Sequence, residues 1–236
     1  MKIMKEDRSI IPSLGISDIE RIKQVVEDTC SVEGIGAYKI GFESVIPHGM
    51  TKVLQTIKDI TNLPVIYDHQ KSGTDIPDTG MKFMKVCKDS GADAVIIFPQ
   101  AGPATETAWI KAANDVGMPV IVGGEMTHPQ YLVSDGGFIA DDAPKRMYET
   151  AAKLGVMDFV VPGNKPERIN YYRGFLESIA IKPVLYSPGL ITQGGQLSDS
   201  AKAAGERWHA IIGRAIYQAK NITEETKTIC KTLKQL

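Results

Sequence analysis

Eight short apolar runs recur along the chain, and a longer stretch rich in polar residues separates each run from the next. The runs are Ser9–Leu14, Ala37–Phe42, Pro64–Tyr67, Ala94–Phe98, Pro119–Val122, Asp158–Val161, Pro183–Tyr186 and His209–Ile212. Most of them are continuously apolar rather than alternating, which is typical of parallel strands covered on both faces. The pattern therefore predicts a parallel sheet of eight strands with helices packed against it.

Helical patterns occupy the connecting stretches. Ser17 and Glu20 have the spacing of a capping box and mark the start of the first predicted helix. Further helices are predicted over Met50–Ile60, Thr79–Ser90, Ala104–Val116, Pro144–Leu154 and Glu167–Ile179. Alternating strands and helices favour an α/β fold of the closed TIM (β/α)8 barrel type over an open doubly wound sheet. The 236 residues suit one such domain over residues 1–236.

Composition and charge exclude several classes of partner. Charged residues make up 23% of the chain and the formal net charge is −1, whereas a nucleic acid or an anionic membrane would favour a basic surface. No apolar run is long enough to span a bilayer, and the N-terminal stretch lacks the apolar core of a secretory signal. Cys30, Cys87 and Cys230 lack the spacing of metal ligands, so we expect reduced thiols in a cytoplasmic protein.

The chemistry of a TIM barrel takes place at the carboxyl ends of its strands. Asp68, Lys71 and Asp75 lie close together in the sequence at the end of the third predicted strand. Two carboxylates and an ammonium group held close together can form an alternating array of charges. Lys39 lies in the second predicted strand, where its side chain can either join this array or extend to solvent.

A phosphate site is predicted from the segments that follow the seventh and eighth strands. Gly189, Gly194 and Gly195 follow the seventh strand, and Gly213-Arg214 follows the eighth. Glycines let backbone N–H groups approach an anion closely, and a helix that begins after the eighth strand presents its positive end. Arg214 adds a cationic donor that can bind phosphate through two hydrogen bonds.

Taken together, these segments resemble the orotidine 5'-phosphate decarboxylase family. That family has an Asp-x-Lys-x-x-Asp pattern at its third strand, followed by Ile-Pro and a Thr, and residues 68–79 are similar to it. Residues 188–195 resemble the family's phosphate loop, and residues 212–217 resemble the end of its eighth strand. Residues 125–129 resemble the stretch that reads the pyrimidine, and Lys39 occupies the place of the family's lysine on the second strand.

The sequence departs from the family at two places. The spacing here is Asp68-x-x-Lys71-x-x-x-Asp75, one residue longer in each gap, which predicts a bulge or an altered loop. The family usually has an aspartate at the end of the first strand that holds the ribose, and this chain has Ser13 there.

The resemblance implies decarboxylation of orotidine 5'-monophosphate to UMP in de novo pyrimidine synthesis, without a metal or an organic cofactor. Lys71 would protonate C6, Asp68 would lie beside the leaving carboxylate, and Lys39 and Asp75 would complete the array. The second aspartate of the family comes from the neighbouring subunit, which implies a homodimer with shared active sites. The substrate-binding residues implied are Thr79, Thr127, Pro188, Gly189, Gln193, Gly194, Gly195, Gly213 and Arg214.

Two other functions stay open from the sequence. A Mg²⁺-dependent sugar-phosphate aldolase or decarboxylase of the same barrel group, such as hexulose-6-phosphate synthase, also uses an Asp and a Lys at the third strand. A barrel that binds a phosphorylated ligand without catalysis would explain both the longer spacing and the missing first-strand aspartate.

Overall fold

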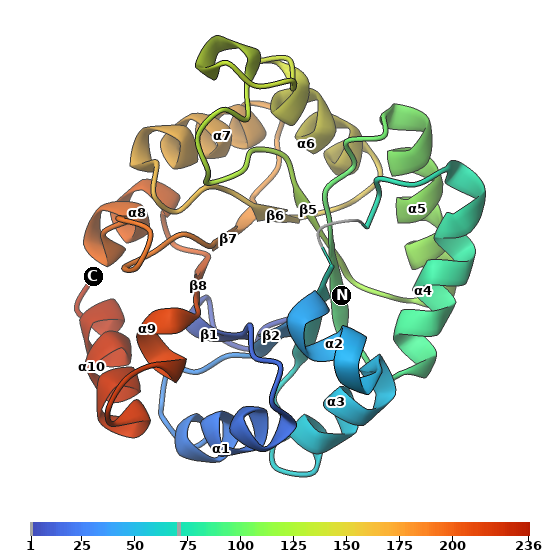
Figure 1. Cartoon of the computed structure of the whole chain (residues 1–236). Helices are drawn as coiled ribbons and strands as arrows, with labels where there is room; N and C mark the ends of the chain where they lie inside the picture. The colour runs from blue at the N-terminus through green and yellow to red at the C-terminus, as the bar shows by residue number, and fades with distance from the viewer. Residues whose placement is uncertain (1, 70–71) are drawn as a thin grey trace.

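The strands form a closed parallel barrel in the order β1 to β8, with each strand next to its neighbour in the sequence. The structure is a computed structural model that describes residues 2–69 and 72–236. The strands are β1 (Arg8–Leu14), β2 (Tyr38–Ile40), β3 (Val65–Asp68), β4 (Ala94–Ile97), β5 (Val120–Gly123), β6 (Asp158–Val160), β7 (Val184–Ser187) and β8 (Trp208–Ile212). Figure 1 looks down the barrel, with the helices in a ring around it. The TIM-barrel prediction is confirmed, and all eight apolar runs form strands.

The helices that surround the barrel follow the strands in turn. They are α1 (Ile19–Thr29), α2 (Phe42–His48), α3 (Met50–Lys58), α4 (Gly80–Asp89), α5 (Pro103–Val116), α6 (Ala143–Lys153), α7 (Pro166–Ser178), α8 (Leu197–Ala204), α9 (Arg214–Tyr217) and α10 (Ile222–Lys234). The five helices predicted by range are present within one or two residues of the predicted bounds. The first helix begins differently, because its N-cap is Asp18, whose carboxylate accepts hydrogen bonds from the amides of Glu20 and Arg21. The capping box proposed for Ser17 was therefore wrong.

The hydrophobic core has two layers, one inside the barrel and one between the barrel and the helices. Ile11, Ile66, Ile121 and Phe98 belong to the inner cluster, which fills the barrel with packed side chains. The outer cluster joins the other face of the strands to the apolar faces of the helices, as with Ile22 on α1. Burial on both faces explains why the strands read as continuous apolar runs.

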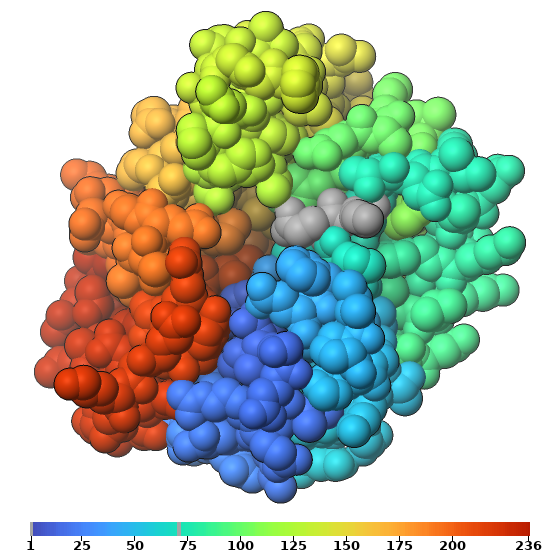
Figure 2. All heavy atoms as spheres, viewed as in Figure 1, coloured from blue at the N-terminus to red at the C-terminus, as the bar shows by residue number. Residues whose placement is uncertain are grey.

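Several loops at one end of the barrel surround a central opening. Figure 2 shows this face: the segment after β5 (yellow-green) and the segment after β7 (orange) lie around the opening with α2 (light blue) and α9 (red-orange). The long stretch Glu125–Asp142 between β5 and α6 contains a short 3₁₀ turn at Val133–Asp135. Tyr131 anchors it, since its buried hydroxyl donates to the Gly124 carbonyl at 2.7 Å. None of the helices in the described residues is both long and apolar enough to cross a membrane.

Candidate active site

A cavity of about 310 Å³ opens at the carboxyl ends of the strands. That volume is at the lower end of the range for small-molecule sites, roughly 300–1,000 Å³. Residues from all eight strands or the loops after them line it, so the barrel brings together segments that are far apart in the sequence. Those that were predicted as site residues are Lys39, Asp68, Thr127, Pro188, Gly189, Gln193, Gly213 and Arg214.

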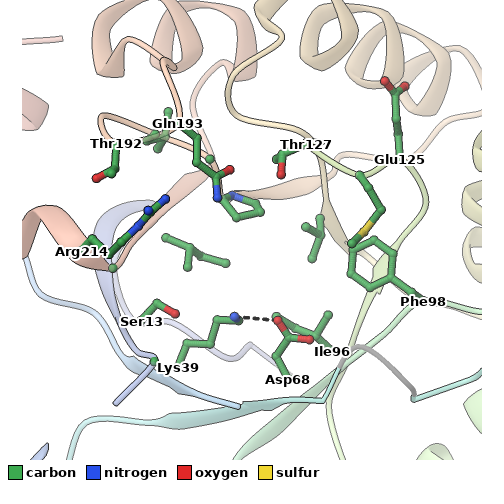
Figure 3. A pocket seen from close by; sticks show the side chains of 18 of the residues that line it. Ser13, Lys39, Asp68, Ile96, Phe98, Glu125, Thr127, Thr192, Gln193 and Arg214 are labelled. Carbon is green, nitrogen blue, oxygen red and sulfur yellow. Dashed lines mark ion pairs between the residues drawn. The ribbon is translucent and has the colours of Figure 1, made fainter. Parts of the chain in front are cut away.

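An ion pair forms the floor of one side of the cavity (Figure 3). Lys39 in β2 lies beside Ser13 of β1 and Ile66 of β3, so its strand position fixes where the ammonium can reach. Its Nζ is 2.7 Å from Oδ2 of Asp68, the last residue of β3. The side chains are 16% and 3% exposed, which leaves the pair poorly screened by water. The pair places opposite charges at the base of the cavity, so the Lys39 side chain turns towards Asp68 rather than to solvent.

The rest of the predicted charge array lies elsewhere or is not described. Lys71, the predicted proton donor, lies outside the described residues. Asp75 is exposed and does not line the cavity of its own chain. Thr79 does not line it either, and its hydroxyl donates to the Ile76 carbonyl at 2.8 Å. Helix α5 holds this segment, because the Thr105 hydroxyl donates to the Asp75 carbonyl at 2.8 Å.

The loop after β7 forms the opposite side of the cavity. Gly189 has a φ of +89°, and a Cβ there would lie 2.7 Å from Thr127 Cγ2 and 3.0 Å from Gln193 Oε1. Glycine therefore supplies both the left-handed backbone and the space that lets Thr127 and Gln193 approach each other. Figure 3 shows these two side chains at the same end of the cavity, facing its interior. The geometry offers an amide and a hydroxyl to a bound molecule.

The remainder of this loop turns back on itself. Leu190 pairs with Gly195, and the Ile191 amide donates to the Gly195 carbonyl at 2.7 Å. Gly194, with a φ of +90°, completes the turn. Gly194 and Gly195 belong to this turn but do not line the cavity. Ile191 has a φ of +61°, a conformation that strains a β-branched residue and is found mainly at functional loops.

Arg214 supplies the cation beside this loop. It follows Gly213 directly after β8, begins α9, and lines the cavity next to Thr192 in Figure 3. Lys39 and Arg214 therefore lie at different parts of one cavity, and Figure 3 shows Ser13 of β1 between them. A molecule with an anion at one end and a reacting group at the other would contact both cations.

The sequence reasoning missed Tyr217, which lines the cavity from the end of α9. Its partial burial and the nearby Glu43 carboxylate raise the pKa of the phenol, and Arg214 opposes this effect. Tyr217 follows Arg214 by three residues, which is one helical turn, so the helix after β8 was the signal that could have revealed it. Among the described residues, no group of three or more His, Cys, Asp or Glu side chains is arranged to hold a metal ion.

Comparisons with known proteins agree with this geometry. A family model described as "Orotidine 5'-phosphate decarboxylase / HUMPS family" matches residues 9–229. The orotidine 5'-phosphate decarboxylase of Methanosarcina barkeri is 33% identical over 230 residues, which cover 96% of this chain and 95% of the relative. The enzyme of that name from Methanocaldococcus jannaschii is 34% identical over 218 residues, 91% of this chain and 93% of the relative.

A solved structure shows the same relationship. The crystal structure of orotidine 5'-monophosphate decarboxylase from Methanocaldococcus jannaschii complexed with inhibitor BMP superposes with a TM-score of 0.83 and 30% sequence identity. The match covers 96% of this chain and 98% of that one. The family match, the full-length relatives and the shared barrel lead to one conclusion: the chain belongs to the orotidine 5'-phosphate decarboxylase / HUMPS family.

Proposed function

We propose that the protein decarboxylates orotidine 5'-monophosphate to UMP, the last step of de novo UMP synthesis. The observation that supports this most strongly is the arrangement of one cavity, with the Lys39–Asp68 pair at its floor and Arg214 beside the loop after β7. A nucleoside monophosphate fits this arrangement, since its phosphate and its base are at opposite ends of the molecule. The names of the relatives support the same substrate.

The proposed roles follow from charge. The bond from C6 to the carboxylate carbon breaks, its electron pair remains on C6, and CO₂ leaves. Lys71 donates a proton to that carbon and is reprotonated from solvent. Asp68, whose carboxylate is almost fully buried, lies beside the substrate carboxylate, and the repulsion between the two is relieved as CO₂ leaves. Lys39 fixes the direction of the Asp68 carboxylate, because its Nζ lies 2.7 Å from Oδ2.

The phosphate is bound far from the reacting carbon. Arg214 and the amides of the loop Pro188–Gln196 bind it, and the loop closes over the substrate as a lid. Binding energy gained at the phosphate then offsets the cost of closing the loop and of bringing like charges together at C6. Thr127 and Gln193, which approach each other across Gly189, bind the pyrimidine and bridge it to the phosphate.

We also propose that the active enzyme is a homodimer in which Asp75 and Thr79 act in the neighbouring subunit's cavity. Both residues lie outside the cavity of their own chain, and Asp75 is exposed. The Thr105 hydroxyl fixes the main chain at Asp75 by donating to its carbonyl, and the Asp75 side chain is exposed to a neighbouring subunit.

The test is the loss of ultraviolet absorbance when purified protein is mixed with orotidine 5'-monophosphate in EDTA. Turnover in EDTA supports the proposal, and turnover that needs Mg²⁺ would support the sugar-phosphate chemistry instead. Binding of UMP without any turnover would make the protein a ligand-binding barrel. Lys71→Ala should abolish turnover and leave UMP affinity within about an order of magnitude, because the lysine acts mainly in the transition state. Near-normal turnover in this variant would contradict the assigned proton donor.

A further inference from the structure

Glu125, two residues after the last residue of β5, has a carboxylate enclosed by three donors. Lys165 Nζ is 3.0 Å from Oε1, and Arg168 Nε is 2.7 Å from Oε2. The hydroxyl of Tyr172 donates to Oε2 at 2.5 Å. The Glu125 side chain is 2% exposed, and Figure 3 shows its carboxylate directed away from the centre of the cavity. This group therefore acts on the site through other residues rather than on a bound molecule.

The donors keep the buried carboxylate ionised. Burial by itself would raise the pKa of Glu125, but hydrogen bonds from Tyr172, Lys165 and Arg168 outweigh that effect and lower it below the usual 4.5. Arg168 also lies over the ring of Tyr172, with its guanidinium carbon 4.8 Å from the ring centroid. The four side chains form one network of contacts, which we call the Glu125 network.

The Glu125 network holds the main chain of the cavity wall. Lys165 Nζ, besides contacting Glu125, donates to the Met126 carbonyl at 3.3 Å. The next residue, Thr127, has its carbonyl held by Asn164 Nδ2 at 3.0 Å. Met126 and Thr127 both line the cavity. Two successive wall residues thus depend on the segment 164–165, and Lys165 is fixed in turn by Glu125.

Gly163, which precedes this segment, has contacts of its own and lies against the loop Pro188–Gln196. The Gly163 amide donates to the Pro188 carbonyl at 2.8 Å, and the Gly163 carbonyl accepts from the Ser200 hydroxyl at 2.6 Å. A Cβ on Gly195 would lie 2.8 Å from the Gly163 carbonyl oxygen, so the two loops are in close contact. Loss of a contact to Glu125 would leave the hydrogen bonds of Gly163 in place. It would loosen mainly the part of the cavity wall that Met126 and Thr127 form.

We propose that Glu125 is a positioning residue which, through Lys165, Arg168 and Tyr172, sets the place of Thr127 and so determines affinity for the base end of the nucleotide but not for its phosphate. The inference rests on the proposed function, because it names which part of that substrate the network serves. It requires no contact between Glu125 and the ligand.

The test compares two buried tyrosines whose hydroxyls each donate to a carboxylate. Tyr172→Phe removes one atom from the Glu125 network. Tyr186→Phe is the matched control, because the hydroxyl of Tyr186 donates at 2.8 Å to Asp158, the first residue of β6, at the end of the barrel away from the cavity. Both variants should lose thermal stability. Affinity for UMP and for ribose 5-phosphate, which lacks the base, is then measured by calorimetry for each.

We expect Tyr172→Phe to weaken UMP binding by about tenfold, the size of one neutral hydrogen bond from Thr127 to the base, and to leave ribose 5-phosphate binding within about twofold. Tyr186→Phe should leave both affinities unchanged. Equal losses for the two ligands in Tyr172→Phe, no loss for either, or the same loss in both variants would overturn the inference. If Tyr172→Phe does not fold, Arg168→Lys keeps the charge and removes the Nε contact, and the same comparison applies. Wild-type protein that binds UMP but does not decarboxylate would refute the proposed reaction and leave this test intact.

Discussion

Glu106 allows a stability prediction whose sign and size follow from burial. It lies in the first turn of α5, is 2% exposed, and its Oε1 has no hydrogen-bond partner within the described part of the chain. Burial raises the pKa of this carboxyl from 4.5 to about 8. Its helical neighbours Thr105 and Trp109 donate to the carbonyls of Asp75 and Ile76, so this turn also supports the proposed shared-site loop.

The pH dependence follows from the difference between the folded and unfolded chains. Above pH 4.5 the carboxyl ionises in the unfolded chain, whereas in the folded chain it keeps its proton up to about pH 8. The folded state therefore binds more protons in this interval, and the free energy of unfolding falls as the pH rises through it. At about 1.4 kcal/mol for each pH unit, the loss between pH 4.5 and neutrality is roughly 3 kcal/mol.

Glu106→Gln keeps the shape of the side chain and removes its ionisation. Unfolding by urea, measured for both proteins at about pH 5 and about pH 7.5, should show the variant gaining roughly 3 kcal/mol on the wild type as the pH rises. Glu149→Gln is the control: Lys153 lowers the pKa of Glu149 below 4.5, so the difference between this variant and wild type should stay nearly constant between the two pH values. A difference between Glu106→Gln and wild type that is the same at both pH values would refute the reasoning.

Three further predictions concern the site. Arg214→Ala should lower kcat/KM for orotidine 5'-monophosphate by about a hundredfold and for the phosphate-free nucleoside by much less, since a charged phosphate contact is lost; equal losses would place the phosphate elsewhere. Gly189→Ala should weaken UMP binding in calorimetry, because its Cβ would lie 2.7 Å from Thr127 Cγ2 on a left-handed backbone; unchanged affinity would contradict this geometry. A mixture of inactive Lys71→Ala and Asp75→Asn proteins should recover about a quarter of wild-type activity after subunit exchange in a symmetric dimer. A mixture that stays inactive despite exchange would argue against shared sites.

The strands and most of the cavity could be predicted from the sequence, because local patterns encode them. A strand that is buried on both faces appears in the sequence as a continuous apolar run. The polar residues at or just after the end of such a run then predict the cavity lining, as with Lys39 and Arg214. Helix α2 was missed because it is short and contains Pro47, which the sequence pattern does not distinguish from a loop. The N-cap of α1 was misplaced because Ser17 and Asp18 are both capable of capping, and only backbone geometry selects between them.

The Glu125 network could not be predicted in the same way. Lys165 and Arg168 lie 40 and 43 residues beyond Glu125, so no helical or strand spacing links them. Only the adjacency of β5 and β6 in the barrel brings the segments together. The altered spacing around Lys71 is a local feature, but its consequence for geometry falls outside the described residues.

The closure of the barrel by β1 and β8 has a consequence for synthesis of the protein. These strands pair over five positions, and Ser9 and His209, 200 residues apart, are joined by a buried hydrogen bond. During synthesis on the ribosome, β1 emerges long before β8. The edge of β1 that pairs with β8 therefore stays unpaired, or is covered by a chaperone, until β8 has been made. Arg214 follows that last strand directly. The proposed phosphate site is therefore completed only after β8 and Arg214 have been made, so a nascent chain that lacks them could not be stabilised by the proposed nucleotide.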